Sequence, residues 1–224
     1  MTRIFSRFGA VVALTAGIAA FATPAQALFL TFEGGATEHT AFQSAAGPTA
    51  LETFDGFAGG TQISSRPGLG IGFGEIAPGL FPGVYVHGVD NTPSLTHQLS
   101  NMPTGFPQVA HQFADIVILA TGAGNLNAFG YWNGDPQGNM VATAFDADDN
   151  VLGSVSAAIS GGFAGFVTDG SVARIVLDGN VGDGWNHVDD LETAFDLFTE
   201  VPTPGAALLF ALGFAGLVSV RRRT

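Results

Sequence analysis

The chain of 224 residues has no cysteine and no lysine, and charged residues make up only 12% of it. Without cysteine no disulfide can hold the fold, so burial alone, or burial together with a bound ion, must stabilise it. The part between the two unusual ends has about 170 residues, which is long enough for one hydrophobic core. We therefore expect a single folded domain, over residues 28–200.

Positive charge is almost confined to the two ends of the chain. Only Arg66 and Arg174 lie within 28–200, whereas all 19 acidic residues lie there, which gives this range a formal net charge of −17. Such a surface repels polyanions, so we expect no nucleic-acid partner and no binding to an anionic bilayer. Cations, neutral glycans and basic proteins are compatible with it. Solubility of an exported protein is an alternative reason for the acidity.

Residues 1–27 have the organisation of a secretory signal peptide. Arg3 and Arg7 form a positive n-region, 9–21 form an apolar h-region, and Ala25 and Ala27 complete an A-x-A cleavage site. A retained membrane helix is the alternative, but the small residues before the site suit a peptidase better. We predict that signal peptidase cuts after Ala27.

The body is rich in short β-type segments bounded by Gly, Pro, Asn or Asp. Four of them have strand length and composition: 28–32, 83–87, 115–119 and 172–177. No stretch shows sustained helical periodicity, and the glycines suit turns and bulges. These features predict an all-β fold, a single antiparallel β-sandwich of the jelly-roll type with roughly ten strands.

The clearest hairpin joins 140–145 to 151–155 through an acidic turn that contains Asp146 and Asp148. Asp and Asn tolerate left-handed geometry and bond their own backbone, so this turn can close without a ligand. Calcium binding is the alternative, because carboxylates and turn carbonyls are hard oxygen ligands. The EF-hand pattern is not met, which favours the plain turn.

A second acidic segment supplies the other candidate calcium ligands: Asp178, Asp183, Asp189 and Asp190. Neighbouring side chains of a strand point to opposite faces, so at most one of Asp189 and Asp190 should turn inward. An inward carboxylate needs a partner, a backbone nest or an ion. An outward one is simply solvated.

Aromatic residues offer a candidate glycan-binding surface formed by Tyr131, Trp132 and Trp185. Aromatic rings beside amides and carboxylates can stack on a sugar while its hydroxyls are hydrogen-bonded. Alternation predicts that Phe129 and Tyr131 share one face of a strand and that Trp132 takes the other. A core tryptophan is the favoured alternative, since β-sandwiches commonly bury one.

Catalytic motifs are absent from the sequence. There is no G-x-S-x-G elbow, no H-E-x-x-H and no cysteine nucleophile. Five histidines are scattered without the spacing of zinc ligands: His39, His87, His97, His111 and His187. We expect a non-catalytic protein. A glycan-active enzyme with a carboxylate pair and a purely structural matrix protein are the alternatives.

The tail has three ordered parts. A short motif is followed by the apolar run 205–220 and by a terminal cationic cluster; the residues of the motif and the cluster are Val201, Pro202, Thr203, Pro204, Arg221, Arg222 and Arg223. This order resembles the PEP-CTERM sorting signal of Gram-negative bacteria, with Thr203 where glutamate is usual. The resemblance implies recognition and cleavage near the motif by an exosortase, and association with exopolysaccharide and biofilm matrix.

The apolar run has 16 residues, which as a helix span about 24 Å, less than a hydrocarbon core of about 30 Å. With the arginines held on the cytoplasmic side by the positive-inside rule, the motif would face outward. Residues 201–224 are therefore expected to occupy the inner membrane only transiently. The body would then reach the outer surface or the extracellular matrix.

The body also loosely resembles exported bacterial jelly-roll domains similar to carbohydrate-binding modules. The stretches that carry this resemblance are 52–61, 144–148, 162–166 and 187–191. It implies a sandwich and permits glycan binding. A binding site does not follow from a fold alone.

Overall fold

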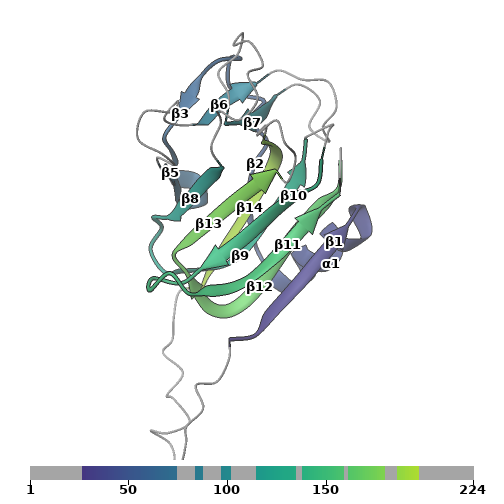
Figure 1. Cartoon of the computed structure of the whole chain (residues 1–224), viewed down its shortest axis with the longest axis vertical. Coiled ribbons are helices and arrows are strands. Elements are labelled where there is room, and N and C mark those ends of the chain that lie inside the picture. The colour runs from purple at the N-terminus through teal and green to yellow at the C-terminus, as the bar shows by residue number, and fades with distance from the viewer. Residues whose placement is uncertain are drawn as a thin grey trace, which may run out of the picture.

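The computed structural model of the chain describes residues 27–74, 84–87, 97–101, 115–134, 138–158, 161–179 and 186–196. Within these ranges it contains fourteen strands, one α-helix and one short 3-10 helix, η1 (Pro67–Leu69). The strands form two antiparallel sheets, and the helix lies outside them (Figure 1). Apart from Ala27, the predicted signal peptide and the whole sorting tail lie outside the described residues.

The larger sheet has eight strands, and its central ones are the longest. Their spatial order is β1 (Phe29–Gly34), β12 (Phe163–Val172), β9 (Asn125–Asn133), β14 (His187–Asp196), β7 (Gln98–Ser100), β6 (Val84–His87) and β3 (Gln62–Ile63), while β2 (Ala50–Glu52) also pairs with β14. Each of these pairings is antiparallel.

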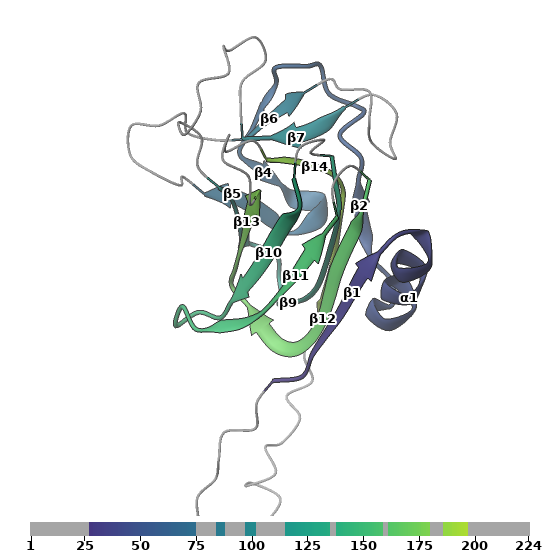
Figure 2. The ribbon, with the colours of Figure 1, turned by 45° about the vertical axis from the view of Figure 1, so that its right-hand side comes forward.

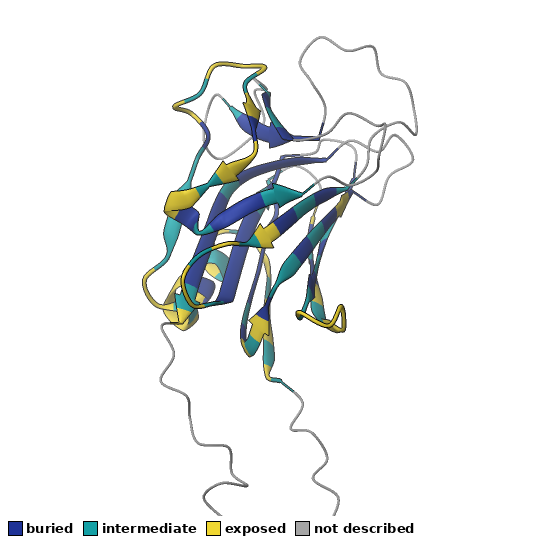
Figure 3. Ribbon diagram, turned by 90° about the vertical axis from the view of Figure 1, so that its left-hand side faces the viewer, coloured by how far each residue is buried: buried dark blue, intermediate teal, exposed yellow. Residues whose placement is uncertain are grey.

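The smaller sheet has six strands and faces the larger one. Their spatial order is β11 (Val151–Ala157), β10 (Met140–Phe145), β13 (Arg174–Gly179), β8 (Ile116–Ala120), β5 (Ile71–Gly74) and β4 (Ser65–Arg66). Side chains from both sheets form one main core cluster, with Phe129 and Phe166 from the larger sheet and Ile118 and Met140 from the smaller. In Figure 3 the buried positions follow the strands, and the exposed positions concentrate in their connections. This arrangement is β-sandwich-like.

The predicted all-β class is therefore confirmed at the level of two antiparallel sheets. All four predicted segments overlap observed strands, although Val172 closes β12 rather than opening β13. The predicted hairpin is β10 and β11, which pair antiparallel from Met140 and Ala157 to Phe145 and Val151. Strand composition and turn chemistry act locally, which is why the sequence reveals them.

The expectation of a body without a helix is wrong. Helix α1 (Ala36–Ala46) packs on the outer face of the larger sheet, over β1, β12 and β9 (Figure 2). Phe42 is its only buried side chain, so α1 carries no continuous apolar stripe that periodicity could reveal. Phe42 lies in a second apolar cluster with Ala128, Phe163 and Ala194. No helix in the described ranges is long and apolar enough to cross a membrane.

Candidate functional site

Polar side chains gather on the outer face of the larger sheet, beside α1. Trp132 is paired with Phe163 on one side and with Asp189 on the other. Directly opposed residues of antiparallel strands share a face, and Phe163 packs against Phe42 of α1. Trp132 and Asp189 therefore lie on the helix side of the sheet. Two residues before Asp189, His187 lies on this face too.

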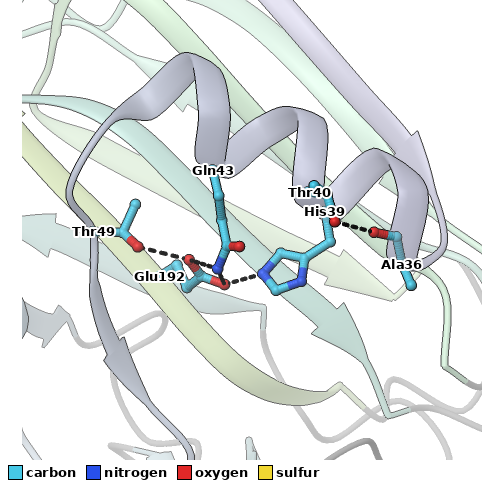
Figure 4. A network of polar contacts seen from close by, with 6 residues as sticks. All are labelled: Ala36, His39, Thr40, Gln43, Thr49 and Glu192. Carbon is cyan, nitrogen blue, oxygen red and sulfur yellow. Dashed lines mark hydrogen bonds and ion pairs between the residues drawn. The ribbon is translucent and has the colours of Figure 1, made fainter.

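The centre of the site is Glu192, whose side chain is only 1% exposed. Its carboxylate accepts hydrogen bonds from His39 Nε2, from Gln43 Nε2 at 3.2 and 3.4 Å, and from Thr49 Oγ1 at 2.8 Å. Figure 4 shows these groups converging from α1 and from the segment that follows it. A buried carboxylate is costly unless it is satisfied, and these donors satisfy it while fixing α1 on the sheet.

Two aromatic rings lie next to His39. The ring centroid of His39 lies 5.4 Å from that of Trp132 and 4.8 Å from that of Phe163. Its side chain is still 23% exposed, so this imidazole stands at the rim of the buried network. The arrangement joins a half-buried histidine, an aromatic wall and a buried carboxylate on one face.

A β-bulge places Asp190 next to this network. The register of β14 against β9 shifts between Asp189 and Glu192, and Asp190 has φ 47°, in the left-handed region. Bulges and left-handed non-glycine residues redirect side chains and recur at functional sites. Strand β14 therefore has an extra residue relative to β9 at this point, where strict alternation of side chains between the two faces was predicted.

The electrostatics of Asp190 are unusual. Burial, followed by the charges of Asp189, Asp55 and Glu192, raises the pKa of the Asp190 carboxyl to about 7, although His39 lowers it. Its Oδ1 atom is buried without a hydrogen-bond partner. A carboxyl group that keeps its proton until near-neutral pH can act as a hydrogen-bond donor or as an acid.

Farther along the same face, two histidines that are 100 positions apart in sequence stack on each other. The ring centroids of His87 and His187 are 5.4 Å apart with an interplanar angle of 25°. Gln98 Nε2 donates to His187 Nδ1 at 2.7 Å. Burial, and then the neighbouring His87, lowers the pKa of His187 to about 4, so its imidazole is neutral at physiological pH.

The glycan-binding role predicted for Tyr131 is corrected by its burial. Its side chain is fully enclosed in the main core, and its hydroxyl donates to the Met140 carbonyl at 2.6 Å. Its ring packs beside Phe129, which leaves no face for a sugar. The predicted division of faces is confirmed, since Phe129 and Tyr131 point into the core and Trp132 points to the α1 side.

Trp132 is the aromatic candidate that stays partly accessible. It is half-buried against the second apolar cluster, so it is neither a fully buried core residue nor a free surface ring. Trp185 lies outside the described residues, and its predicted role is untested.

The hairpin turn uses Asp146 as a backbone cap. Asp146 Oδ1 accepts from the backbone N–H groups of Asp148 and Asn150, both at 2.9 Å, and Oδ2 accepts from the Asn150 side chain at 2.9 Å. These bonds lower the pKa of the Asp146 carboxyl. Asp148 is exposed at the tip. The turn closes through these bonds, with Asp149 at φ 63° and paired to Arg174, and calcium binding by Asp146 and Asp148 stays a prediction.

The remaining calcium candidates do not converge within the described residues. Asp178 is exposed on β13, where its charge adds to burial in raising the pKa of Asp115. Asp189 is fully buried, and its Oδ1 accepts from the Asp190 backbone N–H at 2.9 Å. Asp183 lies outside the described residues. Across the ranges that are described, no three His, Asp or Glu side chains form a metal-binding group.

Sequence reasoning did not find the central residues of this site. Glu192 follows the apolar Leu191 in a β-rich segment, and a carboxylate that becomes buried at such a position needs partners. Its partners His39 and Thr49 are 153 and 143 positions away, and no local pattern could name them.

Comparison with known proteins does not assign this arrangement to a family. No protein-family model matches the chain, and no curated protein matches it. The function of the chain must therefore be inferred from its own residues.

Proposed function

We propose that this chain is an exported cell-surface or extracellular-matrix protein, processed by signal peptidase and by an exosortase, whose working part is a non-catalytic β-sandwich of the jelly-roll type. The position of the two processing motifs around the fold supports the proposal. Strand β1 begins at Phe29, two residues after Ala27, and β14 ends at Asp196, five residues before Val201. Removal of both segments would leave every described strand and helix intact.

The two ends of the folded domain lie at the same end of the larger sheet. Phe29 of β1 pairs with Thr168, and Asp196 of β14 pairs with Asn125, next to the position where Leu126 pairs with Val172 (Figure 1). In the proposed topology, both chain ends would therefore leave the domain toward the membrane during processing. The polar outer face would extend away from it.

Export can be tested by expressing the full chain in a Gram-negative host with and without an exosortase. With the exosortase, we expect a product that has lost Arg221 to Arg223, detected by intact mass. Replacement of those three arginines by alanine should leave the tail attached, whereas Arg174→Ala in the body should not affect processing. Identical tails in both hosts would contradict the proposal.

Within this proposal, Trp132 and Asp190 supply a glycan-binding site. The half-buried ring of Trp132 beside His39, together with the half-buried carboxyl of Asp190, whose pKa the same His39 affects, supports it. A ring face and a hydrogen-bonding carboxyl are the pair of contacts that a sugar needs. Calcium remains a candidate ligand of the acidic residues, and matrix exopolysaccharide remains the candidate partner.

A pull-down with exopolysaccharide tests this site. Trp132→Ala should weaken retention about fivefold, because a stacked aromatic ring contributes about 1 kcal/mol. Leu119→Ala, which trims an exposed apolar side chain on the other sheet, is the matched control. A circular-dichroism melt confirms that both variants are folded. Equal retention of both variants would exclude Trp132 from the binding surface.

A glycan-active enzyme is the second candidate, and the raised pKa of Asp190 favours it. A carboxyl that holds its proton to about pH 7 suits a general acid in glycoside cleavage. Release of reducing sugar by the wild-type chain, abolished in Asp190→Asn, would replace the binding proposal with this one. Absence of release, together with retained glycan, supports binding alone.

A further inference from the structure

The backbone N–H of Leu28 is held by a carboxylate far away in the sequence. It donates to Asp169 Oδ1 at 2.6 Å, and the Asp169 N–H donates back to the Leu28 carbonyl at 3.3 Å. Asp169 lies in the irregular part of β12, where the register against β9 shifts between Val167 and Val172. This pair of bonds closes the ladder between β1 and β12 just before Phe29.

Leu28 is also the residue that the proposed signal-peptide cleavage would expose. Hydrolysis breaks the C–N bond between Ala27 and Leu28; water supplies a hydroxyl to the Ala27 carbonyl carbon and a proton to the Leu28 nitrogen. The nitrogen then gains a second proton from solvent, because a free α-amino group has a pKa of about 7.7–8.0. An amide N–H donor thus becomes an ammonium group at the same place.

We propose that the mature amino terminus is a structural clasp, in which the α-ammonium group of Leu28 forms an ion pair with Asp169 and fastens strand β1 to β12. The inference depends on the proposed cleavage after Ala27. It goes beyond export, because it gives the cleavage itself a role in the stability of the folded domain. Processing converts a hydrogen bond to a neutral amide into a charge-assisted one.

The position of β1 explains why such a clasp is useful. Strand β1 has six residues, and in the described part of the chain β12 is the only strand that pairs with its backbone, while Glu33 Oε1 near its far end accepts from the Ser156 N–H of β11 at 2.7 Å. At the start of the strand Phe29 packs on the core and stacks on Phe166, whereas Leu28 and Leu30 are 55% and 41% exposed and add little apolar burial. Chain ends fray unless their first residues are held. An ion pair at the first residue opposes fraying.

The net charge of the domain is a second reason why a cation at the amino terminus would be stabilising. The range 28–200 contains 19 acidic residues, two arginines and no lysine. The new α-ammonium group would be the third fixed cation of this range, and it would be placed next to an aspartate. In such a negative domain a cation at this point relieves repulsion as well as making a local contact.

The absence of lysine makes the test unusually selective. The full chain is expressed with its own leader in a Gram-negative host, purified, and its amino terminus is determined by sequencing. Reductive methylation with 13C-formaldehyde then labels the α-amino group alone, because the chain has no lysine, and the dimethylated amine keeps its charge. An NMR titration of the labelled methyl groups gives the pKa of this amine.

We expect the sequence to begin at Leu28, and Asp169→Asn to lower the pKa of the amine by about half a unit from the wild-type value, as for an exposed ion pair. Asp148→Asn is the matched control, since it removes one exposed negative charge from a hairpin tip and should change this pKa less. After acetylation of the amine, hydrogen exchange of the β1 amides should become a few times faster.

The outcomes separate the two proposals. A mature chain that begins elsewhere overturns the cleavage after Ala27 and the clasp with it. A chain that begins at Leu28 with the same pKa in wild type, Asp169→Asn and Asp148→Asn overturns the clasp and leaves export standing. Equal shifts of the amine pKa in both variants would show that the amine responds to the overall negative charge and not to Asp169 in particular. That result would also overturn the clasp.

Discussion

The ionisation of Asp190 affects the stability of the outer face of the larger sheet. In the folded chain its pKa is about 7, against 3.8 for an ordinary aspartate. Between these values the folded state binds more protons than the unfolded state, so the contribution of Asp190 to stability falls as the pH rises through this window. Above pH 7 the charged carboxylate opposes folding, although solvent screens part of the effect because Asp190 is only half-buried.

We therefore predict that Asp190→Asn stabilises the domain by about 1 kcal/mol at pH 8 and has a smaller effect at pH 5. Asparagine also tolerates the left-handed backbone at φ 47°. Urea denaturation at both pH values measures the difference, with exposed Asp148→Asn as control. A gain of the same size at both pH values would show that charge is not the cause.

His187 should produce the opposite pH dependence. Its pKa is about 4 in the folded chain and 6.5 as an ordinary value, so between these values the unfolded state binds more protons. Stability should rise by about 2–3 kcal/mol as the pH increases from 4 to 6.5, and be fully present above 6.5.

His187→Gln should flatten this rise, whatever its effect on stability at neutral pH. The comparison is made in the Asp190→Asn background, because Asp190 acts in the opposite direction over an overlapping range. Denaturation curves at half-unit steps of pH give the slope. An unchanged slope in the double variant would assign the pH dependence to other groups, among them His87, whose pKa burial also lowers.

At the scale of elements, α1 is held by one apolar contact region and one polar network. Phe42 packs against Phe163 with ring centroids 5.4 Å apart, and Glu192 gathers donors from α1 and from Thr49. Such a short helix has little stability of its own, so tertiary contacts decide whether it forms. The network is therefore expected to control α1 more than the rest of the fold.

We predict that Glu192→Gln destabilises the domain by about 2 kcal/mol, because the amide cannot accept from three donors at once. The amides of α1 should lose hydrogen-exchange protection before those of β10 and β13. Ser44→Ala, on the exposed side of the same helix, should leave α1 protected. Uniform loss of protection in all elements would mean that Glu192 supports the whole core instead of α1.

At the scale of the whole molecule, the large negative charge should make stability depend on salt. With 19 acidic residues against two arginines in 28–200, self-repulsion opposes the compact state and is screened by ions. We predict that raising NaCl from about 10 to about 200 mM, which shortens the Debye length and so screens the repulsion, increases the Tm by about 3 °C.

Calcium distinguishes screening from a specific site in the same measurement. At matched ionic strength, Ca²⁺ and Na⁺ should give equal melting temperatures if the acidic residues only repel each other. A further rise with Ca²⁺ that is absent with Mg²⁺ would identify a built calcium site. Asp146→Asn would then test whether the hairpin contributes, since its carboxylate already caps the turn.

The sequence by itself determined what depends on local chemistry. The β-rich segments became strands, the Asp and Asn residues after Phe145 closed the β10–β11 turn, and alternation separated Tyr131 from Trp132. These outcomes follow from backbone preferences and from the two-residue period of a strand, and both are properties of neighbouring residues in the sequence.

Tertiary structure alone decided the rest, because the interactions concerned join residues far apart in the chain. Helix α1 is stabilised by the apolar contacts of Phe42 and by the contact between His39 and Glu192, which lie 153 positions apart in the sequence. The sequence could not indicate whether the face that carries Tyr131 would be core or surface, since that depends on which sheet covers it. The bulge at Asp190 arises from the pairing of β14 with β9, and only that pairing places its carboxyl among other charges.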